Sequence, residues 1–450
     1  MNIGDKQIQI INNAKLFLKS LKSSNIDSSL SSFCYFTSWA ETPGYARLKL
    51  QSEGWSFIFK FCSILLKNIL SIASHAEYIE FSNKNLPTNY DIIVLTWSYK
   101  KNFMTDGSFQ DRYFNENSKN LPNSYWILIS MDDYIPSNLD NNIKIIRRKK
   151  TILKYDFFSL IRVIASIIIT NKFSPRKIFN YLFFHSHFAK IITSIIKNEL
   201  KQISCKAILL PYEAQPFQNS IFLEAKKINK KIITMGYLHS ISPLTCELIY
   251  RGGAPDLLLV HGETQIEILK SKLNWPKDKL LLVQSFRYRL IEKETLLKKI
   301  FIPMSIHNYD KLLEEFKKLI IQSPKDNFPI FNIKIHPGTL NSKKHMHLKK
   351  ELEKIMEIYK DRFSDNSPNK NTSLFFGVTS TILQSLEKQI NVIHICSDPI
   401  FQSYSENIWP NLKVKQLSAF TFQYKLNSLG KHINFGKNNT LNQTLKAILN

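Results

Sequence analysis

The feature that most constrains the fold is an alternation of short apolar runs with longer amphipathic segments. This alternation is typical of parallel α/β units, in which each buried strand is followed by a helix that crosses over to the next strand. The runs predict strands at residues 33–37, 92–97, 126–130, 144–146, 207–210, 231–235, 257–260 and 281–283. The longer segments predict helices at residues 54–73, 157–170, 176–202, 220–229 and 264–272.

A second series of the same kind follows a charged stretch at residues 292–299. It predicts strands at residues 300–303, 330–335, 373–376 and 391–395, and helices at residues 308–321, 343–359, 379–388 and 441–449. We therefore predict an α/β protein with two Rossmann-like domains that face a cleft, residues 1–295 and 296–450. The length of 450 residues agrees, because it exceeds what one hydrophobic core usually serves.

The composition narrows the classes of partner. Hydrophobic residues make up 44% of the chain, which is enough to form a core, and a net charge of +25 favours anionic partners. Nucleic acid is disfavoured, since the sequence contains no zinc-finger spacing or RRM signature. The five cysteines form no CxxC pair, so we predict no zinc site, no disulfides and a reduced, cytoplasmic protein.

A basic run, Arg147-Arg148-Lys149-Lys150, lies shortly before the apolar segment 157–170. This combination is typical of attachment to an anionic lipid surface, and a solvated loop before a buried helix is the alternative. The segment is about 14 residues long, and a membrane span needs about 20. We therefore expect a peripheral membrane protein with no transmembrane helix.

Two segments at predicted strand ends indicate a phosphate site. His336, followed by Pro337 and Gly338, comes at the carboxyl end of strand 330–335, where open α/β sheets bind ligands. Its imidazole is suited to donate to a phosphate oxygen or to protonate a leaving phosphate, and capping of the loop is the alternative.

The second segment is the helix start Thr379-Ser380-Thr381, after the next predicted strand. Free N–H groups and hydroxyls at a helix start bind anions, although ordinary N-capping by the same side chains is the alternative. The chain has neither GxGxxG nor GxxxxGK[ST], which disfavours dinucleotide and P-loop NTPase functions.

The first half places further polar groups just after strands. Glu213 follows strand 207–210 and is a candidate base or ligand of sugar hydroxyls, with a helix N-terminal acid as the alternative. His239 follows strand 231–235 and is expected to face the same cleft, with a packed loop histidine as the alternative.

Arg287 and Ser285 lie at the end of the last predicted strand of the first half, and both are candidate phosphate-binding residues. A guanidinium at this place can clamp a phosphate or a carboxylate with two parallel hydrogen bonds. An interdomain salt bridge is the alternative.

These residues resemble a known family. The His-Pro pair after a strand, followed by a strand and a Ser/Thr-rich helix start, resembles the nucleotide-binding half of GT-B glycosyltransferases, most closely those that use CMP-activated acidic sugars, such as bacterial sialyl- and Kdo-type transferases. The segments at residues 106–114, 212–216, 236–240, 254–256 and 287–288 resemble bacterial proteins of surface carbohydrate biosynthesis. The likeness covers roughly residues 90–400.

The resemblance implies transfer of a sugar from a nucleotide donor to a cell-surface or lipid-linked glycan at the inner membrane, and its closest part implies a CMP-linked donor. It implies that His336, Pro337, Ser380 and Thr381 bind the donor phosphate, and it points to Gln215, Tyr237 and His239 as substrate-binding residues. Related transferases often carry a Glu-Ala pair where Gln384-Ser385 stands here, and their Asp-Asp-Gly or Glu-Asp-Gly base motif is missing. Glu213 is therefore our first choice for the catalytic acid or base, and Asp106 the second.

Neither a cofactor nor a metal is expected, although Asp132-Asp133 after strand 126–130 keeps a metal-dependent reaction open. Two alternative functions also stay open. One is a GT-B-like sugar-nucleotide epimerase or a polyol-phosphate transferase. The other is a non-catalytic basic scaffold that binds a membrane or a polysaccharide.

Overall fold

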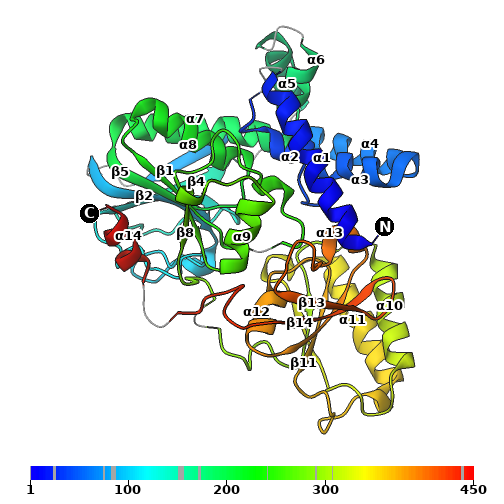
Figure 1. Cartoon of the computed structure of the whole chain (residues 1–450). Coiled ribbons are helices and arrows are strands. Elements are labelled where there is room, and N and C mark those ends of the chain that lie inside the picture. The colour runs from blue at the N-terminus through cyan, green and yellow to red at the C-terminus, as the bar shows by residue number, and fades with distance from the viewer. Residues whose placement is uncertain are drawn as a thin grey trace.

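The computed structural model describes residues 2–23, 27–73, 77–82, 88–149, 157–170, 174–240, 242–288, 291–306, 308–436 and 440–449. The chain forms two mostly parallel β-sheets with helices packed on their faces (Figure 1). The predicted α/β class is confirmed.

The first sheet has eight strands in the order β1-β4-β3-β2-β5-β6-β7-β8. Their bounds are β1 Tyr78–Ser82, β2 Asn89–Ser98, β3 Ser124–Ser130, β4 Ile143–Arg148, β5 Ser204–Pro211, β6 Ile233–Tyr237, β7 Leu257–Val260 and β8 Leu280–Leu282. Only β1 is antiparallel to its neighbour. The central strands are buried on both faces, as expected for a parallel sheet covered on each side.

Alternate residues of the central strands enter two different cores. In β2, Ile93 and Leu95 pack toward α7 and α8, whereas Ile92 and Val94 pack on the opposite face. The helices of this half are α1 Ile3–Ser23, α2 Ser31–Tyr35, α3 Pro43–Glu53, α4 Ile58–Ala73, α5 Phe157–Thr170, α6 Pro175–Tyr181, α7 Phe184–Gln202, α8 Pro216–Ile228 and α9 Glu263–Ser271. Short 3-10 turns are η1 Gly54–Phe57, η2 Lys100–Asn102, η3 Cys246–Leu248 and η4 Lys277–Lys279.

The second sheet has six strands in the order β10-β9-β11-β12-β14-β13. Its strands are β9 Lys299–Ile302, β10 Asn332–Ile335, β11 Thr372–Phe376, β12 Asn391–Ile395, β13 Leu412–Gln416 and β14 Thr421–Leu426, and the last two form an antiparallel edge. The remaining helices and turns are α10 Tyr309–Gln322, η5 Pro337–Thr339, α11 Lys343–Ile358, η6 Lys360–Arg362, α12 Thr381–Glu387, α13 Pro399–Gln402 and α14 Leu441–Leu449.

The predicted division at residue 295 lies where the chain passes from the first sheet to the second. A single cut does not separate the two halves, however, because each end of the chain crosses over. Helix α14 packs through Leu441 and Leu445 on the first sheet. Helix α1 contacts the second half, where the Gln7 amide donates to the carbonyls of Ile400 and Ser403 at 2.8 Å.

Several predicted elements are wrong. Residues 33–37 are predicted as a strand, but helix α2 covers most of them; a short buried apolar run has no periodicity that distinguishes the two. The predicted helix 176–202 is two helices, α6 and α7. Helices α1 and α3, strand β1 and the β13–β14 hairpin were not predicted.

Most of the basic run before α5 does not form a solvated loop, which was the alternative to lipid attachment. Arg147 and Arg148 end strand β4, and Arg147 donates to the Asp133 carbonyl at 3.1 Å. Lys149 pairs with Glu77 at 2.7 Å. Lys150 lies outside the described residues.

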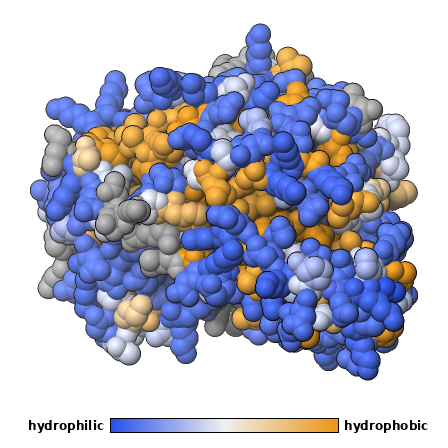
Figure 2. Space-filling model, turned by 60° about the horizontal axis from the view of Figure 1, so that its bottom comes forward, coloured by the Kyte–Doolittle hydropathy of each residue, from blue (hydrophilic) through white to orange (hydrophobic). Residues whose placement is uncertain are grey.

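Among the described residues, one helical stretch, Pro43–Ile72, is long and apolar enough to cross a membrane by length and composition. The expectation that the chain has no transmembrane helix did not include such a stretch. The stretch combines α3, η1 and α4, and most of its apolar part is not buried in the protein. Elsewhere, Figure 2 shows a mostly hydrophilic surface that is crossed by apolar bands.

Candidate active site

The loops after strand ends of the two sheets meet in space. The Tyr288 hydroxyl, after β8, lies 2.9 Å from the Ser380 hydroxyl, which precedes α12 of the second half. The polar residues predicted at strand ends of the two halves therefore belong to one neighbourhood.

Glu213 and His239 form a buried pair at the ends of β5 and β6. One Glu213 carboxylate oxygen lies 3.1 Å from His239 Nε2 and accepts the Ser240 hydroxyl at 2.8 Å. The other oxygen accepts the Gln215 side-chain amide at 3.0 Å. The sequence prediction that these residues converge is thus matched by direct contacts.

These contacts fix the charge of Glu213. Burial alone raises the pKa of this carboxyl, but the His239 charge and the hydrogen bonds from His239 and Ser240 outweigh burial and lower the pKa to about 2. A carboxylate with so low a pKa is a poor proton acceptor near neutral pH. Its geometry suits it better to orient His239 than to act as the base itself.

The backbone beside Glu213 is held in an unusual conformation. Ala214 has a φ of 53°, in the left-handed region that side chains other than glycine rarely adopt. Its carbonyl is fixed by the Ser32 hydroxyl at 3.0 Å and by Arg251 Nη2 at 2.9 Å. Surrounding contacts therefore impose the turn that presents Glu213.

Sequence reasoning missed Tyr113 and Asp111. The Tyr113 ring packs edge-on against His239, with ring centroids 4.4 Å apart. Asp111 is buried and positions the loop, because its carboxylate accepts the Tyr113 N–H at 2.7 Å and the Thr96 hydroxyl at 2.7 Å. Burial raises the pKa of this carboxyl. The sequence signal that could have found Asp111 was its place in the segment 106–114, but within that segment Asp106 was chosen as the candidate catalytic residue.

Arg287 reaches toward the same pair without an acidic partner of its own. Its Nη1 donates to the His239 carbonyl at 3.3 Å, and its guanidinium lies 5.7 Å from the Tyr113 ring centroid. In the described part of the chain no carboxylate lies within ion-pair distance of Arg287. Arg287 therefore does not form the interdomain salt bridge that was its alternative role.

Tyr237 and Ser285 hold the backbone of the loop that carries Arg287. Both are fully buried, and the Tyr237 hydroxyl accepts the backbone N–H groups of Phe286 at 3.1 Å and of Arg287 at 3.4 Å. The Ser285 hydroxyl accepts the Tyr288 N–H at 3.1 Å. In this arrangement they position Arg287 and present no side-chain atoms to a ligand, in contrast to the binding roles predicted for them.

A group of cations from the first half faces His336 of the second half. Partial burial, and then the charges of Arg287, Arg112, His345 and Lys101, lower the pKa of His336 to about 4, so this imidazole is neutral near pH 7. We call Lys101, Arg112 and Arg287 the cationic group. Arg112 and Lys101 both lie beside the Tyr99 ring, and burial and the Arg112 charge lower the pKa of Lys101. Such crowding of positive charge is unfavourable unless an anion binds there.

The ring of His336 is oriented by its own loop. The Gly338 N–H donates to His336 Nδ1 at 3.1 Å, so in the neutral ring the proton is on Nε2. His336 therefore does cap its own loop, as the alternative to phosphate binding proposed. This cap uses Nδ1 and leaves Nε2–H of His336 as a donor. His336, Pro337 and Gly338 are all exposed, at the start of turn η5.

The hydroxyls before α12 are bonded mainly to one another. Thr379 Oγ1 accepts the Thr381 N–H at 3.3 Å and donates to the Thr381 hydroxyl at 3.1 Å, and Ser380 bonds Tyr288. Glu387 on the same helix is structural, since it accepts the N–H groups of His432 and Ile433.

The structure does not join Asp106 to this neighbourhood by any contact. Its exposed carboxylate pairs with Lys119 at 2.8 Å and accepts the Ser108 hydroxyl at 2.7 Å, which stabilises a loop turn at Gly107. Asp132 accepts the Lys100 N–H at 2.6 Å. Within the described ranges no cluster of three or more His, Cys, Asp or Glu side chains could hold a metal ion.

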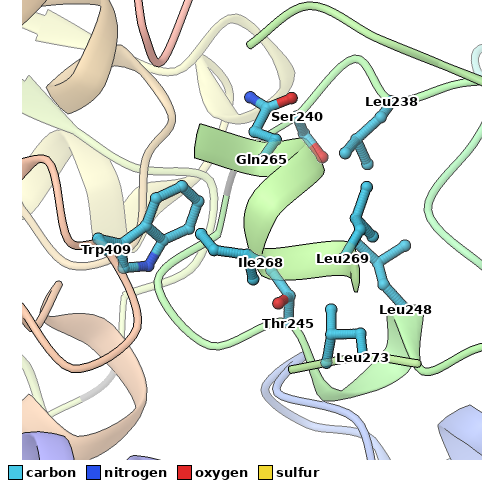
Figure 3. A pocket seen from close by; sticks show the side chains of 9 residues that line it. All are labelled: Leu238, Ser240, Thr245, Leu248, Gln265, Ile268, Leu269, Leu273 and Trp409. Carbon is cyan, nitrogen blue, oxygen red and sulfur yellow. The ribbon is translucent and has the colours of Figure 1, made fainter. Parts of the chain in front are cut away.

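A pocket lies beside the Glu213–His239 pair, between the first half and Trp409 of the second (Figure 3). The space not filled by atoms amounts to about 270 Å³, which includes open solvent at the mouth of the pocket. Six apolar and three polar residues line it, namely Leu238, Leu248, Ile268, Leu269, Leu273, Trp409, Ser240, Thr245 and Gln265. This apolar lining does not suit an anion, and only Ser240 links the pocket to Glu213.

Comparisons with known proteins add little. No family model matches the sequence, and no curated protein matches it. Among solved structures, the chain is similar to the crystal structure of a glycosyltransferase from Rickettsia africae ESF-5, with 13% sequence identity, a TM-score of 0.31, and coverage of 68% of this chain and 79% of that one. A TM-score this low assigns neither fold nor function, so the function is proposed from the site.

Proposed function

We propose that this protein is a glycosyltransferase of the GT-B arrangement that transfers a sugar from a nucleotide donor to an acceptor hydroxyl. The observation that carries the proposal is the juxtaposition of two unlike groups. An ionised carboxylate–imidazole pair, Glu213 and His239, lies beside cations of the first half that face the neutral imidazole of His336 in the second half.

The cationic group fits the leaving phosphate of a nucleotide sugar. Negative charge develops on that phosphate as the glycosidic bond breaks, and preorganised donors that face it lower the barrier. Arg287 offers a planar fork of N–H groups, and His336 of the second half offers Nε2–H. These residues supply the charge stabilisation directly.

The Glu213–His239 pair fits the acceptor side. An acceptor hydroxyl must lose a proton as it attacks, and imidazole is the commonest group that takes one. Glu213 binds His239 at Nε2, which leaves Nδ1 as the second ring nitrogen; this atom is buried and has no hydrogen-bond partner within the described part of the chain. We therefore assign proton transfer to His239 and its orientation to Glu213.

The number of cations favours a donor with two anionic groups. The three cations Lys101, Arg112 and Arg287 exceed the single negative charge of one phosphate diester. A CMP-linked ulosonate carries a phosphate and a carboxylate, and a nucleoside diphosphate sugar carries two phosphates. We propose the CMP-linked acidic sugar as donor and a cell-surface or lipid-linked glycan as acceptor, at the cytoplasmic face of the membrane.

A thermal-shift screen of CMP, UDP and GDP compounds tests the donor. A ligand that binds the folded state raises its apparent stability, so a selective response to CMP compounds supports the proposal. Arg287→Met should abolish the shift, whereas Lys119→Met, a paired lysine bonded to Asp106, should preserve it. A response to uridine or guanosine diphosphates alone would contradict the assignment of a CMP-linked donor, but it would still support a nucleotide site.

Nucleotide release with an acceptor glycan tests the reaction. Sugar transfer that depends on His239 supports glycosyl transfer. Conversion of the donor sugar without any acceptor would instead indicate an epimerase, and the absence of any nucleotide binding in the wild-type protein would refute the site.

A further inference from the structure

Two helices expose large apolar side chains to solvent. Trp55, Phe59 and Leu66 protrude from η1 and α4, and Phe158, Ile161 and Ile169 protrude from α5. Exposure is 84% for Trp55, 87% for Phe59 and 77% for Phe158. We call these six residues the α4–α5 surface.

The exposed residues follow helical spacing. On η1 and α4 the exposed positions 55, 59, 62 and 66 form one stripe, while Ile64, Asn68 and Ile72 are buried on the other side. On α5 the exposed positions 158, 161, 165 and 169 form a second stripe. The two helices belong together, since Ile72 and Leu160 share one small cluster.

The charges on the two helices are of one sign. Lys60 and Lys67 on α4 and Arg162 on α5 are exposed. Neither residues 54–73 nor residues 157–170 contain an aspartate or a glutamate. Helices that combine an apolar stripe with cations and no acids are typical of attachment to the interface of an anionic bilayer.

The geometry argues against a membrane span. Helix α3 ends at Gly54, whose φ is +68°, so α3 and α4 are not one continuous helix. Helix α3 is fixed to the second half, where Lys49 pairs with Asp398 at 2.9 Å. Helix α4 has 16 residues, a length of about 24 Å, and the hydrocarbon core is about 30 Å thick.

Charge also distinguishes lipid from a second copy of the chain. If the α4–α5 surface of one molecule packed on that of another, it would bring cations against cations with no acid on either helix. Anionic headgroups provide the missing counter-charge. We propose that the α4–α5 surface inserts its aromatic residues into the interface of an anionic bilayer while Lys60, Lys67 and Arg162 contact the headgroups.

Flotation of the full chain with vesicles tests this surface. Phosphatidylcholine vesicles with phosphatidylglycerol should bind the protein, and phosphatidylcholine alone should bind it weakly. Each of Trp55→Ser and Phe59→Ser should weaken binding about tenfold, since each removes a large apolar surface that insertion would bury. Ile358→Ser, an exposed apolar position on α11, is the matched control and should bind normally.

The same variants separate the possible occupants. Equal binding by Trp55→Ser, Phe59→Ser and the control would overturn the proposal, as would a wild-type dimer in solution that Phe59→Ser dissociates. Because these residues are exposed, the variants should fold and keep the nucleotide thermal shift. A loss of vesicle binding with an intact shift therefore tests the membrane surface apart from the proposed reaction.

Discussion

The two halves of the candidate site differ in how completely they are built. In the first half Glu213 and His239 are held by each other and by neighbours, next to the strained turn at Ala214. In the second half His336 is exposed, and the hydroxyl of Thr379 is bonded only within its own turn. One half is preorganised, and the other is open.

This difference suggests a division of labour. Groups that act on developing charge or on protons work best when surrounding contacts fix them in advance. Donors on an open surface gain their partners only when a ligand arrives. We therefore expect substitutions in the first half to lower kcat, and substitutions at His336 and its cationic neighbours to change donor binding.

The largest effect should come from His239→Asn. Loss of a general base lowers kcat by about 10²–10⁴, and the donor KM should change little because the cationic group stays intact. Glu213→Gln keeps the hydrogen-bonding shape and should give a smaller loss. Initial rates of nucleotide release measure both.

Asp106→Asn is the control for this prediction, because Asp106 contacts Lys119 and Ser108 only in a loop turn. It should retain nearly full kcat. If Asp106→Asn lowered kcat as much as His239→Asn does, the base would be Asp106, and the proposed role of the Glu213–His239 pair would be wrong.

The second effect should appear in binding. Arg287→Met removes hydrogen bonds to a charged ligand, each contributing about 1.5–3 kcal/mol, so the donor Kd should rise roughly 10–100-fold. Lys101→Met should act in the same direction more weakly, since its ammonium lacks a planar fork. Isothermal titration calorimetry measures both, and an unchanged Kd in both variants contradicts a phosphate at this place.

Much of the sheet structure could be predicted because buried parallel strands are short, apolar and bounded by polar residues. Strands β7 and β12 and helices α5 and α14 lie where the sequence places them. Helix α2 could not be predicted, since its five residues are all buried and have no polar face. Edge strands such as β13 are half exposed and have no distinctive pattern.

The site could be predicted only in part. Ligands bind after strand ends, and this rule found Glu213, His239, Arg287 and His336. It could not separate side chains that point into the cleft from those that point into the core, as Tyr237 does. The edge-on contact between Tyr113 and His239 joins segments 126 residues apart, and no local pattern encodes it.

The third prediction concerns protons at His336. Burial and nearby cations lower its pKa to about 4 from 6.5, so the free imidazole is neutral above that range. A bound phosphate offsets those cations and favours the imidazolium, which raises the pKa. Between pH 4 and 6.5 donor binding should therefore take up protons, at most one for this ring.

Calorimetry at pH 6 in two buffers of different ionisation enthalpy measures the uptake, and His336→Gln should abolish it. The same shift affects folding with a definite sign. The unfolded chain binds more protons at this histidine between pH 6.5 and 4, so stability falls as the pH falls through that window. Uptake that persists in His336→Gln would assign the proton to another group.

The smallest effect should come from the link between the halves, the hydrogen bond of Tyr288 to Ser380 at 2.9 Å. A double-mutant cycle of Tyr288→Phe and Ser380→Ala should give a coupling of about 0.5–1.5 kcal/mol in the free energy of unfolding. If Ser380 turns to the donor phosphate when nucleotide binds, the coupling should vanish in saturating nucleotide, and Ser380→Ala alone should then weaken binding. A coupling that is unchanged by nucleotide would show instead that Ser380 only joins the two halves. The donor-binding residues would then be His336 and the cations that face it, without Ser380.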